Sequence, residues 1–261
     1  MPMILETFAL SRYFGGLKAV DGVDFKLQEG DFHSIIGPNG AGKTTFLNLI
    51  SGELKPTSGQ VLFKGKDITR FPTHRMAHLG IGRSYQISNL FSNLTVLENV
   101  RLAAQALGRD NFQALRDYRN FDQYRQQAAT ALERVGLAKD ANQVVTSLPH
   151  GDKRRLELAM LLAQDPEVLL LDEPTAGLAT EQVPEFMDLV KTVASAGGKT
   201  IVLVEHNMSV VMRLSDRVSV MHQGRLLAEG PPGEIAANTT VQSAYLGSLY
   251  EDLGGLTGEK Q

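Results

Sequence analysis

The sequence predicts an α/β fold with a helical insertion, and three observations lead to this conclusion. A strand with a buried pattern is predicted at residues 32–36 and runs directly into a glycine-rich loop, and a helical pattern follows at residues 44–50. Apolar strands and a further helical pattern recur later in the chain, at residues 168–171, 181–194 and 200–204. Between these parts, residues 94–137 are polar and rich in Gln and Arg, with a helical pattern at residues 124–135. Strands alternating with helices indicate the α/β core, and the polar stretch indicates an inserted helical subdomain.

Short strands separated by turn residues account for the two ends of the chain. The first three strands are predicted at residues 5–10, 23–27 and 61–63, and a Lys64-Gly65 hairpin turn follows the last of them. Near the other end, a Gln223-Gly224 turn predicts a hairpin between residues 218–222 and 225–228. A terminal segment with helical stretches follows this hairpin.

Composition limits the classes of function that fit. The 261 residues are 43% hydrophobic and 21% charged, which is typical of a globular protein with a sizeable core. A net charge of −3 gives no support to a nucleic-acid role, which usually needs a basic patch. The chain has no cysteine, so disulfides and thiolate metal sites are excluded. We find neither a secretory signal pattern nor a run of about 18 apolar residues, so the sequence predicts no membrane span.

The glycine-rich loop matches the phosphate-binding pattern G-x-x-x-x-G-K-[ST]. It consists of Gly37, Pro38, Asn39, Gly40, Ala41, Gly42, Lys43 and Thr44. Glycines allow the backbone to curl with its N–H groups directed at phosphate oxygens, and the following helix adds its positive end. We expect Lys43 to contact the β- and γ-phosphates of ATP, Thr44 to ligate Mg²⁺, and Thr45 to add a phosphate contact.

Two adjacent acids end the apolar strand at residues 168–171. Open α/β sheets bind their ligands at the carboxyl ends of the strands, which is where Asp172 and Glu173 lie. We expect Asp172 to hold Mg²⁺, directly or through water, and Glu173 to act as the general base on the attacking water.

With these two motifs the sequence resembles the ATP-binding subunits of ABC transporters, and the resemblance covers nearly the whole chain. It implies a P-loop NTPase (RecA-like) core with an N-terminal antiparallel β subdomain and an inserted α-helical subdomain. It predicts a single ABC ATPase domain over residues 1–250, followed by a polar tail at 251–261. Within the domain the predicted parts are the core at 1–86 and 156–230, the helical subdomain at 87–155, and a C-terminal helical segment at 231–250.

Three single residues acquire roles from this resemblance. Phe14 lies where the family stacks an aromatic ring on adenine; the alternatives are a core aromatic or a neighbouring role for Tyr13. Gln86 matches the switch glutamine that contacts Mg²⁺ or the attacking water. His206, which follows the last core strand, matches the switch histidine.

Pro149, His150, Gly151 and Asp152 occupy the family's signature motif, which faces the γ-phosphate bound by a second subunit. Apolar residues at helical spacing follow, so the motif is predicted to open a helix. Pro149 stands where the family usually has Ser, and Asp152 where it has Gln. Asp152 brings negative charge towards phosphate unless an Arg or Lys pairs with it. In a later loop, two further departures from the family pattern are Ala176 and Ala179.

Other stretches point to a partner and to a subgroup. Residues 87–96 are apolar for a loop and either form a docking surface for a membrane protein or pack locally in the core. Residues 14–20, 90–100 and 244–247 resemble the ATPase subunits of branched-chain amino acid importers. That subgroup also serves other amino acids, urea and small amides.

The resemblance therefore implies an ATP-hydrolysing, energy-coupling subunit of an ABC importer that uses ATP and Mg²⁺. A single loop and a single signature motif require a second ATPase subunit, as a homodimer or a heterodimer. The expected partners are two integral membrane permease subunits and, indirectly, an extracytoplasmic solute-binding protein, with no nucleic acid. The expected location is cytoplasmic, peripheral on the inner face of the plasma membrane. The alternatives are a soluble ABC ATPase without a transport role and a weakly hydrolysing, nucleotide-gated binding module.

Overall fold

The computed structural model describes residues 2–84, 90–108 and 122–245. The chain divides into two compact units, one formed by Met1–Pro72 with Thr200–Gln261 and the other by Thr73–Lys199. The predicted division of the domain at residues 87 and 156 remains a prediction.

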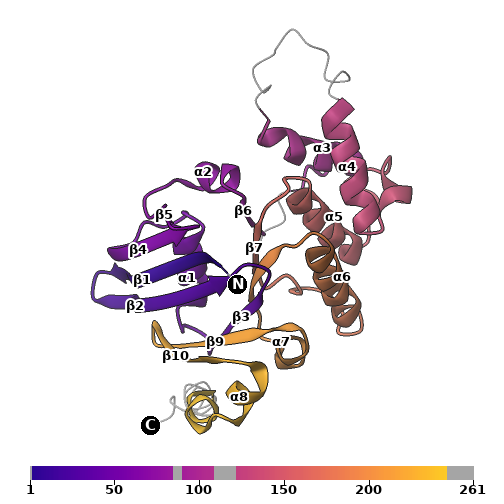
Figure 1. Cartoon of the computed structure of the whole chain (residues 1–261). Helices are drawn as coiled ribbons and strands as arrows, with labels where there is room; N and C mark the ends of the chain where they lie inside the picture. Colours follow the sequence, from indigo (N-terminus) through magenta and orange to yellow (C-terminus); the bar gives the residue numbers. More distant parts are fainter. Residues whose placement is uncertain (1, 85–89, 109–121, 246–261) are drawn as a thin grey trace, which may run out of the picture. The chain divides into compact units, whose positions relative to one another are not determined.

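An antiparallel sheet occupies the N-terminal part of the first unit (Figure 1). Its strands lie in the order β2-β1-β4-β5, with β1 at Met3–Phe14, β2 at Leu17–Gln28, β4 at Ser58–Phe63 and β5 at Lys66–Asp67. The three predicted strands fall inside β1, β2 and β4, and Lys64-Gly65 forms the turn before β5. β1 and β2 are longer than predicted because their pairing continues to Phe14 and Leu17. This confirms the predicted antiparallel β subdomain.

Parallel strands form the second sheet region of this unit. β3 (Phe32–Ile36) lies between β8 (Thr200–Val204) and β9 (Arg217–His222) and is parallel to both. β10 (Arg225–Gly230) pairs antiparallel with β9, so the late hairpin is confirmed. All five residues of β3 are buried, which confirms the prediction of a buried strand.

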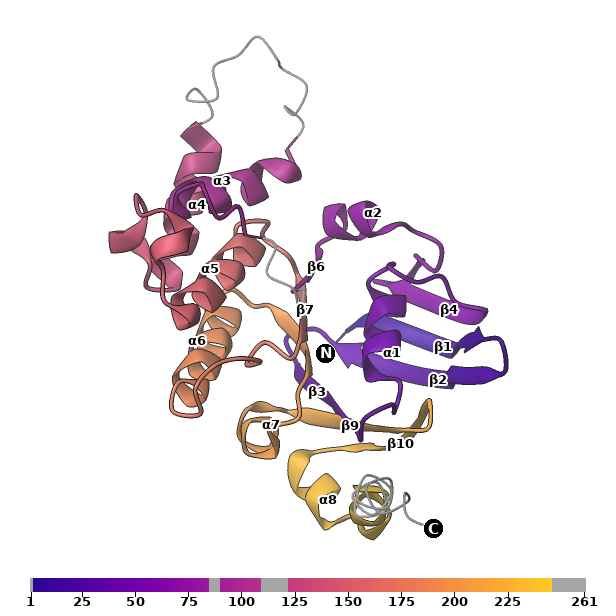
Figure 2. The same ribbon diagram turned by 180° about the vertical axis from the view of Figure 1, so that it is seen from behind.

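Helices pack against the strands of this unit. α1 (Lys43–Ile50) lies beside the antiparallel sheet (Figure 2), and its Phe46 meets Phe25 of β2 edge-on, with ring centroids 5.4 Å apart. α7 (Met208–Leu214) and α8 (Pro232–Ala237) contribute to an apolar cluster that contains Ile36 at the end of β3. The carboxyl end of β3 is therefore fixed by core packing.

The second unit combines two parallel strands with a group of helices. β6 (Ile81–Arg83) pairs with β7 (Val168–Asp172), and the helices that precede and follow these strands are α2 (Thr73–His78) and α6 (Val183–Ala196). The inserted helices are α3 (Val96–Ala106), α4 (Asp122–Arg134) and α5 (His150–Leu162), with single 3₁₀ turns η2 (Ala138–Asp140) and η3 (Val145–Ser147). The predicted helices at 124–135 and 181–194 are confirmed as α4 and α6, each displaced by one or two residues. Among the described residues, no helix is long and apolar enough to cross a membrane.

A buried histidine in β3 makes the stability of the first unit sensitive to pH. His33 is fully buried, its Nε2 atom lies 2.8 Å from the Ser219 hydroxyl, and Nδ1 has no hydrogen-bond partner in the described part of the chain. Burial lowers the pKa of His33 from 6.5 to about 4; Glu229 opposes this and Arg217 adds to it. Between these two values the unfolded chain binds a proton that the folded chain does not, so stability falls as the pH falls.

We therefore expect the free energy of unfolding to decrease between pH 7 and pH 4 in the wild type more than in His33→Leu. The decrease in the wild type should be larger by up to about 3 kcal/mol. Urea unfolding at a series of pH values measures this difference, with His74→Leu, an exposed histidine, as the matched control. A difference that stays constant with pH would contradict a neutral, buried His33.

Candidate functional site

Two glycines of the phosphate loop are required by close packing as well as by backbone conformation. Gly42 has φ 98°, and a Cβ at this position would overlap the carbonyl oxygen of Ala19 in β2. A Cβ at Gly37, where φ is 156°, would overlap the carbonyl oxygen of Met221 in β9. The loop is thus held between β2 and β9, and side chains at these two positions would displace it.

The rest of the loop presents donors at the start of α1. In the described part of the chain no side chain caps this helix, whose N-cap residue is Gly42. Lys43 is buried, and its Nζ donates to the carbonyl oxygens of Gly37 at 2.8 Å and Pro38 at 3.0 Å. Its neighbour Thr44 is exposed. The uncapped helix start and the ammonium group form an environment suited to phosphate.

The remaining loop residues differ in exposure. Asn39 and Gly40 are exposed, Pro38 and Thr45 are half-buried, and Ala41 is buried. The N–H of Ala41 donates to the carbonyl of Pro38 at 3.2 Å, and its carbonyl accepts from Gly224 at 3.0 Å. The loop is therefore tied to the turn between β9 and β10.

Phe14 lies at the end of β1 and is 43% exposed, so it is not a core aromatic. The guanidinium of Arg12 sits 4.5 Å from the centroid of its ring. Its neighbour Tyr13 instead donates its hydroxyl to Asp21 at 2.6 Å. Of the two candidate aromatics, Phe14 is the one with an exposed ring, and its stacking on adenine remains a prediction.

His206 follows β8, at the edge of the parallel strands where the phosphate loop follows β3. Ile35 of β3 pairs with Val204 of β8, so the loop after β3 and the residues after β8 begin side by side. His206 is exposed, and its backbone N–H donates to the carboxylate of buried Glu205 at 3.0 Å. This edge is where open α/β sheets bind ligands.

The sequence patterns did not identify Tyr245 as a site residue, although it lies beside the start of the phosphate loop. It packs against the cluster that contains Ile36, the residue before Gly37. Burial raises the pKa of Tyr245 to about 12, while a hydrogen bond from the Gly37 backbone lowers it by less. The only sequence signal was the subgroup resemblance of residues 244–247, of which 246 and 247 lie outside the described residues.

The two acids lie in the second unit, at the carboxyl end of β7. Asp172 is the last residue of the strand and is buried, and its backbone N–H donates to the Ser84 hydroxyl at 3.1 Å. Glu173 follows with φ 47°, a left-handed conformation that is uncommon for a residue with a side chain. Such strained residues are concentrated at functional sites. Gln86 lies outside the described residues, so its role stays a prediction.

Arg83 is a partner of Asp172 that sequence reasoning missed. Its Nη2 lies 3.2 Å from Oδ2 of Asp172, and the two side chains are 7% and 2% exposed. The two residues end adjacent parallel strands, although 89 positions separate them. No local sequence signal identifies this pair, because β6 has only three residues and the partners are far apart in the chain.

The signature motif opens α5, as predicted: the helix begins at His150, with Pro149 as its N-cap. Gly151 and Asp152 occupy its first turn. Asp152 has a cation nearby, because Nε of Arg155 lies 3.8 Å from its carboxylate. That contact is long for a hydrogen bond, and Arg155 makes a shorter ion pair, 2.6 Å, with Glu185.

The loop that contains Ala176 and Ala179 contacts α5 through the backbone of the loop. Arg154 donates to the carbonyl of Ala176 at 2.8 Å and to Glu157 at 2.8 Å. A Cβ at Gly177 would lie 3.0 Å from the His150 ring, so ring and loop are close together. These contacts do not need the side chains that Ala176 and Ala179 lack.

An exposed apolar patch lies beside the helical insertion. Its residues are Phe91, 54% exposed, Leu94, 37%, and Val144, 40%, and we call them the Phe91 patch. Buried Asn99 holds the segment in place, because it accepts from the Phe91 N–H at 2.8 Å and donates to the Phe91 carbonyl at 3.1 Å. Local core packing is therefore wrong for Phe91 and Leu94; residues 87–89 lie outside the described residues.

Comparison with known families gives two matches. The family described as "ABC transporter" matches residues 20–176, which include the phosphate loop, the signature motif and both acids. The family described as "Branched-chain amino acid ATP-binding cassette transporter" matches residues 225–250.

Individual relatives agree with these matches. The high-affinity branched-chain amino acid transport ATP-binding protein LivG of Salmonella typhimurium is 41% identical over 249 residues, covering 94% of this chain and 98% of LivG. BraF of Pseudomonas aeruginosa, with the same description, is 39% identical over 252 residues, again covering 94% and 98%.

Solved structures share the fold. The ADP conformation of MJ1267, an ATP-binding cassette of an ABC transporter, has a TM-score of 0.83 and 30% identity, covering 95% of this chain and 100% of that one. The dimeric structure of MJ0796, a bacterial ABC transporter cassette, has a TM-score of 0.74 and 29% identity, covering 88% and 99%.

Proposed function

Because the chain belongs to the ABC transporter family of ATP-binding proteins, we propose that it is the ATP-hydrolysing, energy-coupling subunit of an importer. Its substrates are branched-chain amino acids or related small polar solutes, such as other amino acids, urea or amides. The observation that carries this proposal is the complete phosphate loop, in a chain that matches LivG over 94% of its length.

The first unit supplies the residues that bind the nucleotide. Phe14 stacks on adenine, where its exposed ring offers an apolar face, and the amides at the start of α1 bind the phosphates. Lys43 exchanges its bonds to the Gly37 and Pro38 carbonyls for bonds to phosphate oxygens, and Thr45 adds a hydroxyl. These contacts orient the γ-phosphate for attack.

The donor set fits Mg²⁺. Among the described residues, no cluster of three His, Cys, Asp or Glu side chains could hold a metal by itself. Magnesium bound together with a nucleotide needs only one or two protein oxygens, because phosphates and waters complete its shell. The exposed Thr44 hydroxyl and the Asp172 carboxylate are hard oxygen donors of this kind, and Gln86 is a third candidate. When bound, Mg²⁺ neutralises charge that develops on the phosphates.

Hydrolysis depends on a base and on groups that orient the water. Glu173 accepts a proton from the attacking water as general base. Its left-handed backbone fixes the direction in which the side chain leaves the end of β7. Gln86 and His206 orient the water and the γ-phosphate.

A second ATPase subunit completes each nucleotide site. Pro149, His150, Gly151 and Asp152 begin α5, and this helix start faces the γ-phosphate held by the other subunit. The second subunit is another copy of this chain or a related chain. The dimer binds two permease subunits at the inner face of the plasma membrane, and a solute-binding protein delivers the substrate on the other side.

The Phe91 patch is the docking surface for a permease subunit. We expect Phe91→Ser to weaken association with the membrane subunits about tenfold or more, because burial of a Phe side chain contributes about 1.5–3 kcal/mol. ATP binding by the isolated chain should be unchanged. Co-purification from membranes measures the association, and Phe8→Ser, at a residue that is 41% exposed in β1, is the matched control. Equal recovery of both variants would contradict a docking role for Phe91.

The choice between an importer subunit and a non-transport ATPase is tested by its partners. The tagged chain, expressed from its native operon, is expected to co-purify with integral membrane proteins. Recovery only with ribosomes or DNA would exclude the transport function.

A further inference from the structure

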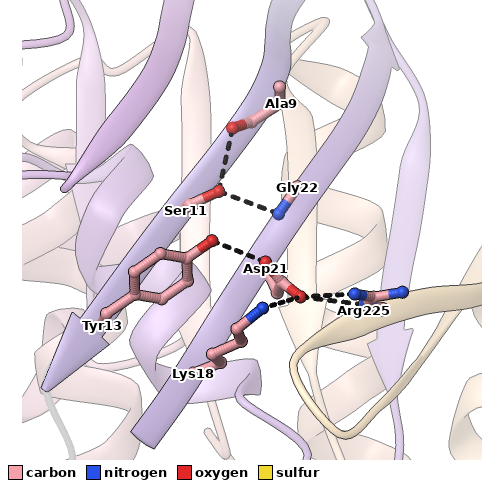
Figure 3. Close-up of polar contacts among 7 residues, drawn as sticks. All are labelled: Ala9, Ser11, Tyr13, Lys18, Asp21, Gly22 and Arg225. Carbon is pink, nitrogen blue, oxygen red and sulfur yellow. Dashed lines mark hydrogen bonds and ion pairs between the residues drawn. The ribbon is translucent and has the colours of Figure 1, made fainter. Parts of the chain in front are cut away.

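Three side chains converge on Asp21 in β2 (Figure 3). The Tyr13 hydroxyl donates to Oδ1 at 2.6 Å, while Nε and Nη2 of Arg225 donate to Oδ2 at 3.0 and 2.6 Å. The ammonium of Lys18 lies 3.4 Å from Oδ2. Asp21 is only 12% exposed. The carboxylate thus joins the end of β1, the start of β2 and the start of β10.

These contacts keep Asp21 ionised. The pKa of Asp21 is lowered from 3.8 to about 2. The hydrogen bond from Tyr13 contributes most to this shift, and the hydrogen bond from Arg225 contributes next. The group therefore stays a carboxylate at neutral pH, and it is not a switch near that pH.

The backbone of Asp21 connects this cluster to the phosphate loop. Its N–H donates to the carbonyl of Gly224 at 2.8 Å, and the N–H of Gly224 donates to the carbonyl of Ala41 at 3.0 Å. Gly224 has φ 78°, and a Cβ there would lie 2.7 Å from the carbonyl oxygen of Lys18. The turn between β9 and β10 therefore packs closely between β2 and the phosphate loop. Arg225, the residue after Gly224, is bound by the Asp21 side chain.

The Tyr13 contact connects the same cluster to Phe14. Successive side chains of a strand point to opposite faces, so a Tyr13 ring held by Asp21 directs the Phe14 ring to the other face of β1. Asp21 thereby connects two places. One is the end of β1, which carries the exposed Phe14 ring, and the other is the turn between β9 and β10, which supports Ala41.

We propose that Asp21 is a positioning residue for nucleotide binding, which holds Phe14 in register with the phosphate loop. It contacts neither the reacting phosphate nor the water, so it raises the affinity for ATP without changing the rate of hydrolysis. This inference rests on the proposed function of Phe14 and of the loop.

Asp21→Ala is expected to bind ATP about tenfold more weakly, in a titration of the full chain. The kcat of the assembled complex at saturating ATP should stay within about twofold. In a Phe14→Ala background, Asp21→Ala should have little further effect on affinity, because Asp21 acts through that ring. Arg225→Leu should reproduce the loss. Arg217→Gln, which breaks a 2.8 Å ion pair with Glu229 in the same hairpin, is the matched control and should bind as the wild type does.

Circular dichroism and thermal melting establish that each variant is folded. If Asp21→Ala does not fold, Asp21→Asn keeps the volume and the acceptor for Tyr13, and a threefold loss of affinity is expected. Wild-type affinity in the folded variant, or effects of Asp21→Ala and Phe14→Ala that simply add, would overturn the positioning role. Unchanged affinity in Phe14→Ala alone would instead contradict the proposed adenine contact.

Discussion

Replacement of Glu173 by Gln is expected to leave ATP binding intact and to reduce turnover in the assembled complex about a thousandfold. Glutamine has nearly the same volume but cannot accept the proton of the attacking water. A thousandfold loss corresponds to about 4 kcal/mol of activation free energy, which is typical of the removal of a general base. Steady-state phosphate release measures the turnover, and a nucleotide titration of the same preparation measures binding.

Asp165→Asn is the matched control for Glu173→Gln. Asp165 also has a left-handed backbone, with φ 50°, but its carboxylate is exposed and pairs with Lys199. It should retain wild-type turnover. If wild type and Glu173→Gln were equally slow in the assembled complex, the catalytic assignment would be wrong, and the chain would act as a nucleotide-gated binding module.

Lys43→Ala is expected to reduce ATP affinity by roughly a hundredfold or more, so that micromolar nucleotide no longer binds. The change removes a cation that would make charge-assisted bonds to two phosphates, each contributing about 1.5–3 kcal/mol. It also removes the bonds from Nζ to Gly37 and Pro38 that close the loop. A fluorescent-nucleotide titration measures the affinity.

Lys64→Ala, in the turn after β4, controls for the loss of one positive charge from the same unit. It should bind ATP as the wild type does. Tight nucleotide binding by folded Lys43→Ala would mean that residues 37–45 are not the phosphate site.

The elements that frame the site could be predicted because their signals are local. β7 is a continuous apolar run up to Asp172, and β3 runs directly into the glycine-rich loop. The glycine pattern between β3 and α1 identifies the phosphate loop without any long-range information. The start of α5 could likewise be read from apolar residues at helical spacing. β6 was missed because it has three residues, with Gly82 in the middle.

The contacts that connect these elements could not be predicted, because they join distant residues. Arg83 and Asp172 are 89 positions apart, and Asp21 and Arg225 are 204 apart. Nothing in the local pattern around Asp21 distinguishes it from a solvated surface acid. The Phe91 segment was ambiguous for another reason: an apolar run without periodicity indicates neither burial nor exposure.

ATP-dependent uptake of labelled leucine tests the energy-coupling function most directly. The chain is reconstituted into proteoliposomes with the membrane subunits that co-purify with it. The solute-binding protein is added on the side of the membrane opposite to this chain. We predict uptake that requires ATP on the side of this chain and stops with Glu173→Gln, although that variant still binds ATP. The same assay is repeated with other amino acids, urea and amides. If the uptake of every one of these solutes, leucine included, depended neither on ATP nor on Glu173, that result would contradict the function proposed for this protein.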